Sequence, residues 1–166
     1  MSTRASLIIS VYNNTSFLRV VLDSLKFQTE QNFEIIISED ACHEEMKHFI
    51  ESYPFENEYQ HLSQDDNGWQ KNKALNNAIK AAKSDWLIFI DGDCVLHPRF
   101  IEMHLRYAQE DTILAGKRVK LDEKTSNFLQ ADISRNIFQM QKILLGKIFF
   151  GKGDIRFLED SIFISP

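Results

Sequence analysis

Residues 84–95, SDWLIFIDGDCV, decide how the rest of the sequence is interpreted. The apolar run at 86–90 predicts a strand buried on both faces, as in the middle of a mostly parallel sheet. Asp91, Gly92 and Asp93 fall at its carboxyl end, where open α/β sheets bind ligands. Two carboxylates one residue apart can both ligate one Mg²⁺ or Mn²⁺ ion together with substrate phosphates, and a glycine between them leaves room for a diphosphate. Asp-Gly is also ordinary turn chemistry, but its place after the apolar run favours a metal and diphosphate site.

Apolar runs alternate with helical periodicity from residue 6 to residue 121. This alternation predicts an α/β fold: a three-layer α/β/α sandwich whose central sheet is mostly parallel and Rossmann-like. We expect strands at 6–11, 33–38, 59–62, 86–90 and 112–121, and helices at 16–27, 43–51, 69–83 and 99–109. Because parallel strands bring their carboxyl ends to one edge of the sheet, the polar residues that follow them should lie together.

Polar residues follow the first two strands as well: Tyr12 and Asn13 after the first, and Asp40 after the second. Tyr12 can lay its ring on a nucleobase, and Asp40 can accept a hydrogen bond from a base or a ribose. The alternatives are half-buried packing for Tyr12 and a solvated loop position for Asp40. The coincidence of three polar strand ends favours a binding site.

The turn into the helix at 69–83 is the other place where candidate residues gather: Asp66, Lys71, Lys73 and Asn76. A lysine near a helix start can meet a phosphate, and the first amide groups of the helix favour an anion at the same place. The alternative is a solvated helix face, which we expect for at least one of the two lysines.

The bulk composition is that of a globular protein. Its 166 residues suit one domain with a single core, and a formal net charge of -5 argues against nucleic-acid binding. Cys42 and Cys94 lack the spacing of a disulfide framework or a zinc site, so we expect a reducing compartment. With no apolar run of membrane-span length and no signal-peptide core at the N-terminus, we expect a cytoplasmic location.

Three stretches resemble the family 2 glycosyltransferases of the GT-A fold: SLIISVYNN, SLKFQTEQNFEIIISEDA and QDDNGWQKNKALNNAIKAAKSDWLIFIDGDCVLHPRFIE. The resemblance covers about residues 5–121. It implies the GT-A nucleotide-diphospho-sugar transferase fold and a nucleotide-sugar donor, most often a UDP-sugar, bound with Mn²⁺ or Mg²⁺. It also implies a saccharide or lipid-linked acceptor in the synthesis of a cell-surface polysaccharide.

The resemblance also implies roles for individual positions. Tyr12 and Asp40 match base-contacting positions, Asp91 matches the aspartate that contacts ribose or donor sugar, and Asp93 matches the metal ligand. Ser10 stands where the family usually has proline or threonine. The predicted metal ligands are Asp93 and Asp91, and the predicted nucleotide-sugar-binding set is Ser10, Tyr12, Asn13, Asp40, Asp66, Lys71, Asn76, Asp91, Gly92 and Asp93.

Residues 122–166 differ in character from those before them. We expect one GT-A-type domain in which residues 1–121 form the nucleotide-sugar-binding core and residues 122–166 begin the acceptor-side region of a longer enzyme. Family members take a catalytic base from that region, and we assign none here; Asp160 has the right order in the chain but lacks the expected surroundings. The basic and apolar segment 135–156 suggests contact with the inner face of a membrane or, alternatively, a helix that covers the core.

Two other functions fit parts of the sequence. A nucleotide-sugar-binding module without turnover would need only the donor-side residues. A haloacid-dehalogenase-type phosphatase carries Asp-x-Asp-x-Thr/Val after a buried strand, a pattern that residues 91–95 match. In that class the nucleophile strand normally opens the domain, whereas two clear strands precede this one.

Overall fold

The computed structural model describes residues 3–150 and 155–156. The chain divides into two compact units, Met1–Glu110 and Asp111–Pro166. The first unit contains a four-stranded sheet and its helices, and the described part of the second has an irregular segment, an isolated bridge and three helices.

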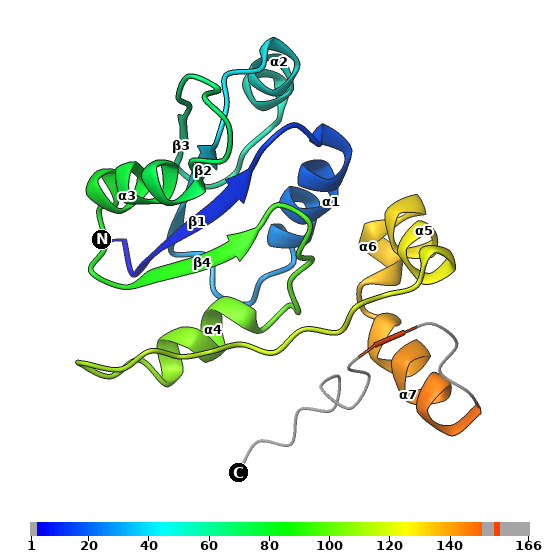
Figure 1. Ribbon diagram of the computed structural model, residues 1–166. Helices are drawn as coiled ribbons and strands as arrows, with labels where there is room; N and C mark the ends of the chain where they lie inside the picture. Colours follow the sequence, from blue (N-terminus) through cyan, green and yellow to red (C-terminus); the bar gives the residue numbers. More distant parts are fainter. Residues whose placement is uncertain (1–2, 151–154, 157–166) are drawn as a thin grey trace. The chain divides into compact units, whose positions relative to one another are not determined.

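The sheet of the first unit has four parallel strands in the order β3-β2-β1-β4 (Figure 1). β1 and β2 are buried on both faces almost throughout, as expected for the central strands of a parallel sheet. The strands predicted at 6–11, 33–38, 59–62 and 86–90 are confirmed as β1 (Ala5–Val11), β2 (Phe33–Glu39), β3 (Tyr59–Leu62) and β4 (Leu87–Asp91).

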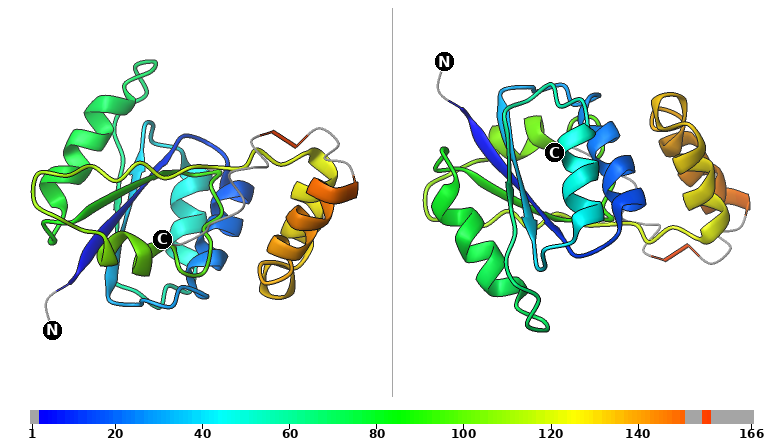
Figure 2. Two further views of the ribbon diagram at one scale, coloured as in Figure 1. Left: turned by 90° about the horizontal axis from the view of Figure 1, so that it is seen from below. Right: turned by 90° about the horizontal axis from the view of Figure 1, so that it is seen from above.

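Helices cover both faces of this sheet, so the predicted three-layer α/β/α arrangement is confirmed. Leu7 and Ile9 pack in a cluster with α1, α2 and α4, whereas Ile8 and Ile36 pack in a second cluster with α3. Figure 2 shows α3 on the opposite side of the sheet from α1 and α2. The predicted helices are confirmed with small shifts of their ends, as α1 (Thr15–Leu25), α2 (Glu44–Ser52), α3 (Lys71–Ala81) and α4 (Phe100–Arg106).

One expectation about β4 is wrong. The strand was expected in the middle of the sheet, but in the described part of the chain it pairs with β1 alone and lies at the edge. Phe89 lies opposite Ile8 and is 48% exposed, while Ile8 is fully buried. Phe89 is exposed because α3 packs mainly over β1, β2 and β3.

A buried carboxylate joins the amino ends of the strands. Glu34, which is fully buried, accepts hydrogen bonds at Oε1 from Ser6 Oγ (2.6 Å) and from the Lys83 amide (2.7 Å), and at Oε2 from Gln60 Nε2 (3.2 Å). Ser6 Oγ accepts in turn from the amide of Ser84 at 3.1 Å. Donors from β1, β3 and the segment leading into β4 thus converge on one side chain of β2, and bonds to a charged acceptor are the stronger kind.

In the second unit, the prediction of a strand at 112–121 is wrong. Among its described residues this segment forms only an antiparallel bridge between Lys120 and Arg156, and Ile113 is 96% exposed. A strand requires a partner for its backbone groups, and the apolar pattern alone does not provide one. Helices follow, as the helical period after residue 126 predicts: α5 (Glu123–Ala131), α6 (Ile133–Asn136) and α7 (Met140–Phe150). None of the described helices has the length and apolar character needed to cross a membrane.

Candidate functional site

The turn after β4 carries the carboxylates that the sequence singles out. Asp91 is the last residue of β4, and its Oδ1 accepts a hydrogen bond from Lys71 Nζ at 2.5 Å. Lys71 begins α3, so the start of this helix and the end of β4 meet through an ion pair. Lys73 is exposed, as expected for one of the two lysines.

Asp91, Asp93 and Cys94 each offer one ligand atom, and these atoms lie within 4.8 Å of one another. Asp93 is exposed, whereas Asp91 and Cys94 are partly buried. Burial, and then the charges of Asp93 and Asp91, raise the pKa of the Cys94 thiol, which keeps it neutral and makes it a poor ligand for a hard ion. The donor set therefore fits a divalent cation held by carboxylate oxygens.

Gly92 has a packing role besides the expected one of leaving room for a diphosphate, which stays a prediction. A Cβ on this residue would lie 2.7 Å from Val11 Cγ1 and 3.1 Å from the carbonyl oxygen of Ser10. The amide of Gly92 also donates to that Ser10 oxygen at 2.8 Å. The glycine lets the turn after β4 pack directly against the end of β1, and this contact sets the place of the two aspartates.

Asp40 lies at the end of β2 and is 8% exposed. Its Oδ1 accepts from Gln64 Nε2 at 2.7 Å, and its Oδ2 accepts from the amide of Gln70 at 2.9 Å. The carboxylate fastens the segment 64–70 to the carboxyl end of the sheet, and its expected contact with a base or a ribose stays a prediction. Gln64 and Gln70 were not identified from the sequence. The signal that points to Gln70 is its place before α3, because the first amide groups of a helix need acceptors from outside it.

Tyr12 follows β1 and is 48% exposed. Its hydroxyl donates to Asp66 Oδ2 at 3.0 Å, and Asp66 Oδ1 accepts from the amide of Gly68 at 3.2 Å. The bond to Asp66 and the charge of that carboxylate raise the pKa of Tyr12, so its hydroxyl keeps the proton that it donates. Gly68 has a φ of 80°, a left-handed conformation that favours glycine. The hydroxyl end of the Tyr12 ring is thus held by Asp66, which belongs to the segment 64–70 that Asp40 anchors.

The remaining predicted residues make fewer contacts with the strand-end carboxylates. Ser10 lies between Ser38 and Asp91 in the register of the sheet, so the three side chains share the face that α3 covers. Ser38 was not identified from the sequence; its Oγ is buried and has no hydrogen-bond partner among the described residues. Asn13 and Asn76 are exposed, and no hydrogen bond joins either of them to the strand-end carboxylates in the described part of the chain.

The chain resembles known proteins over most of its length. The family model for "Glycosyl transferase family 2" matches residues 6–164. EpsH of Bacillus subtilis (strain 168), whose name describes it as a glycosyltransferase, is 30% identical over 91% of this chain and 44% of its own length. The hyaluronan synthase of Pasteurella multocida is 28% identical over 70% of this chain and 12% of its own length. The chain thus spans less than half the length of these curated relatives.

Solved structures share the fold. TarS of S. aureus matches with a TM-score of 0.51 and 22% identity over 60% of this chain and 18% of its own. The mannosyltransferase PcManGT of Pyrobaculum calidifontis, solved with GDP-Man and Mn²⁺, matches with a TM-score of 0.50 and 18% identity over 63% of this chain and 31% of its own. These likenesses confirm the GT-A type of α/β fold. Because the family model spans nearly the whole sequence, the chain belongs to glycosyl transferase family 2.

Proposed function

We propose that this chain is the donor-binding part of a metal-dependent glycosyltransferase that moves a sugar from a nucleotide-diphosphate sugar to a saccharide or lipid-linked acceptor. The product would be a cell-surface polysaccharide, as the names of relatives such as the hyaluronan and chondroitin synthases suggest. The observation that carries the proposal is the meeting of Lys71, Asp91 and Asp93 at the carboxyl end of β4.

In this proposal Asp93 and Asp91 hold Mn²⁺ or Mg²⁺, which would neutralise charge on the departing diphosphate. Lys71 pairs with Asp91 and brings a positive charge to the place where the diphosphate would lie. Its ammonium group can exchange this carboxylate for a phosphate oxygen when a donor binds. Lys71 therefore has two tasks. When no ligand is bound, it lowers the repulsion between the two aspartates; when the donor is bound, it contacts the donor's phosphate.

The nucleotide end of the donor would lie at Tyr12. The half-exposed ring offers an apolar face for a base, and the bond from its hydroxyl to Asp66 limits its rotation. A UDP-sugar is the proposed donor. One TarS structure that shares the fold was solved with UDP, whereas PcManGT was solved with GDP-Man, so the choice of base is tested directly below.

Isothermal titration calorimetry tests the proposal. The chain should bind UDP in the presence of Mn²⁺, and Asp93→Asn should abolish this Mn²⁺-dependent binding because it removes the most accessible carboxylate of the donor set. Asp85→Asn is the matched control, since Asp85 is also exposed but precedes β4 instead of following it. GDP and ADP in the same titration measure the preference for the base. Equal UDP affinity in wild type and Asp93→Asn would refute the assignment of the metal site.

A binding module without turnover is the second candidate function. It is favoured by one observation: the described side chains that meet at the carboxyl end of β4 are ones proposed to bind the donor. Asp160, the weak candidate for a base, lies outside the described residues. Hydrolysis or transfer of a UDP-sugar by the chain would decide for the enzyme. The phosphatase alternative gains no support, because the family model matches a glycosyltransferase.

A separate proposal concerns a membrane surface. Leu145 and Phe149 of α7 are 43% and 78% exposed, and Lys142 on the same helix is exposed as well. Apolar side chains beside lysines suit a helix that lies at the surface of an anionic bilayer. We propose peripheral contact of segment 135–156 with the inner face of the cytoplasmic membrane.

A further inference from the structure

A buried glutamate lies one residue before Asp40, between two histidines. Glu39 ends β2 and is 1% exposed. Its Oε1 accepts from the amide of His43 at 2.9 Å and lies 3.2 Å from Nδ1 of the same residue, while its Oε2 lies 2.8 Å from Nε2 of His61. A buried carboxylate is costly unless it has hydrogen-bond partners, and here the His43 amide and two imidazole nitrogens lie within hydrogen-bonding distance of it.

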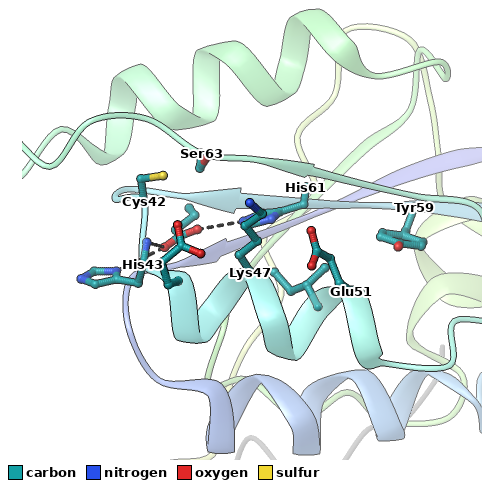
Figure 3. A pocket seen from close by; sticks show the side chains of 10 residues that line it. Cys42, His43, Lys47, Glu51, Tyr59, His61 and Ser63 are labelled. Carbon is teal, nitrogen blue, oxygen red and sulfur yellow. Dashed lines mark hydrogen bonds and ion pairs between the residues drawn. The ribbon is translucent and has the colours of Figure 1, made fainter.

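These groups lie in a cavity of about 390 Å³ beside β3 and α2. Figure 3 shows His43 and His61 at this cavity, with Lys47 and Glu51 further along α2. The metal-ligand geometry found at Asp91 is not repeated here, because no group with three ligand atoms within 4.8 Å includes these histidines in the described residues. The arrangement holds a side chain in place; it does not form a metal centre.

Glu39 holds the side chain of His43, and the His43 ring contacts Tyr12 in the candidate nucleotide site. Its ring lies edge-on to the ring of Tyr12, with the centroids 5.2 Å apart and an interplanar angle of 87°. Tyr12 is held on its hydroxyl side by Asp66. His43 therefore makes the second contact that limits the orientation of the Tyr12 ring, and the Glu39 carboxylate fixes the orientation of His43.

We propose that His43, oriented by Glu39 and His61, is a positioning residue that sets the Tyr12 ring for stacking on the nucleobase of the donor. This inference rests on the proposed function, because it assumes that Tyr12 contacts a base. His43 would act through Tyr12 and would touch no phosphate. Its loss should affect binding of the base and leave binding of the diphosphate intact.

The alternative role for this cluster is to stabilise the fold. His43 is the residue before α2, and Glu39 accepts its backbone amide, so the carboxylate also supports the start of that helix. If His43 only stabilised the fold, its replacement would lower the stability and weaken the affinity for every ligand of the site by the same factor. A positioning role predicts a loss restricted to ligands that carry a base.

The test compares UDP with inorganic pyrophosphate, each titrated calorimetrically with Mn²⁺ into the full chain. His43→Ala should weaken UDP binding about 3–10-fold, the range expected for one aromatic contact, and leave pyrophosphate binding unchanged. His43→Phe keeps an aromatic edge and should restore part of the loss. His48→Ala is the matched control, because His48 is an exposed histidine of α2 that makes no contact with Tyr12.

A double-mutant cycle ties the effect to Tyr12. In a Tyr12→Ala background, His43→Ala should have no further effect on UDP affinity, since the ring that it orients is absent. Equal UDP affinity of wild type and a folded His43→Ala variant would overturn the inference alone. So would parallel losses for UDP and pyrophosphate. A wild-type chain that binds neither ligand would instead overturn the proposed function.

Discussion

Replacing Gly92 by alanine tests whether contact between β4 and β1 shapes the proposed metal site. The new Cβ would lie 2.7 Å from Val11 Cγ1 and 3.1 Å from the Ser10 oxygen. Both neighbours are constrained, because Val11 is 8% exposed in the core and the Ser10 oxygen accepts the amide of residue 92. The extra carbon can be accommodated only if Val11 shifts or if the turn that carries Asp91 and Asp93 moves.

Overpacking of this kind costs about 1–3 kcal/mol of unfolding free energy. For a unit of this size, each kcal/mol corresponds to roughly 4–8 °C in Tm. We expect Gly92→Ala to melt at least about 4 °C below wild type and to bind Mn²⁺ more weakly, because the turn that carries both carboxylates is displaced. Thermal and urea unfolding followed by circular dichroism measure the first effect, and Mn²⁺ titration calorimetry measures the second.

Two variants control this experiment. Gly146→Ala should have the opposite sign and stabilise α7 by about 0.5–1 kcal/mol, since nothing lies within 4 Å of its Cβ position and glycine is unfavourable inside a helix. In a Val11→Ala background, Gly92→Ala should cost less, because the nearest obstacle is gone, with a coupling energy of about 0.5–3 kcal/mol. Wild-type stability and Mn²⁺ affinity in Gly92→Ala, or strict additivity in the double mutant, would refute the packing argument.

Three further predictions follow from the described contacts. Lys71→Ala should weaken pyrophosphate binding in the presence of Mn²⁺, whereas Lys73→Ala should not, because only the first lysine reaches Asp91; calorimetry that finds the same loss in both would contradict the assignment. Burial lowers the pKa of His97, with the charge of Arg99 as a second cause, and burial also lowers the pKa of His104. Because the unfolded chain then binds more protons, the contribution of these histidines to the free energy of unfolding is fully present above pH 6.5 and is lost as the pH drops below 6.5. A urea midpoint that does not decrease when the pH is lowered from 7.5 to 5.5 would contradict this. Finally, the chain should sediment with anionic but not with neutral liposomes, and sedimentation that is insensitive to lipid charge would exclude the proposed membrane contact.

The order of strands and helices was predictable from the sequence because apolar period and turn residues are local signals. Four strands and four helices of the first unit lie close to their predicted bounds. The edge position of β4 was not predictable, since its apolar run does not tell whether a second strand pairs with it. The strand expected at 112–121 failed for a related reason: the pattern describes one segment and carries no information about a pairing partner.

The candidate site shows the same division. Asp91, Asp93 and Lys71 were identified from residue type and place, and the structure brings them together. The bonds of Asp40 to Gln64 and Gln70, and the packing reason for Gly92, depend on contacts between distant segments. No local pattern encodes such contacts.

The Glu34 network gives the sheet two ends of unequal stiffness. At the amino ends of the strands, three donors and a buried carboxylate tie β1, β2, β3 and the segment before β4 together. At the carboxyl ends, exposed loops carry Tyr12, Asp66 and Asp93. Hydrogen exchange should therefore be slower at the amides of residues 83 and 84 than at those around the carboxyl ends of the strands. Such a gradient would let the carboxyl-end loops adapt to the proposed donor while the amino ends of the strands keep their arrangement.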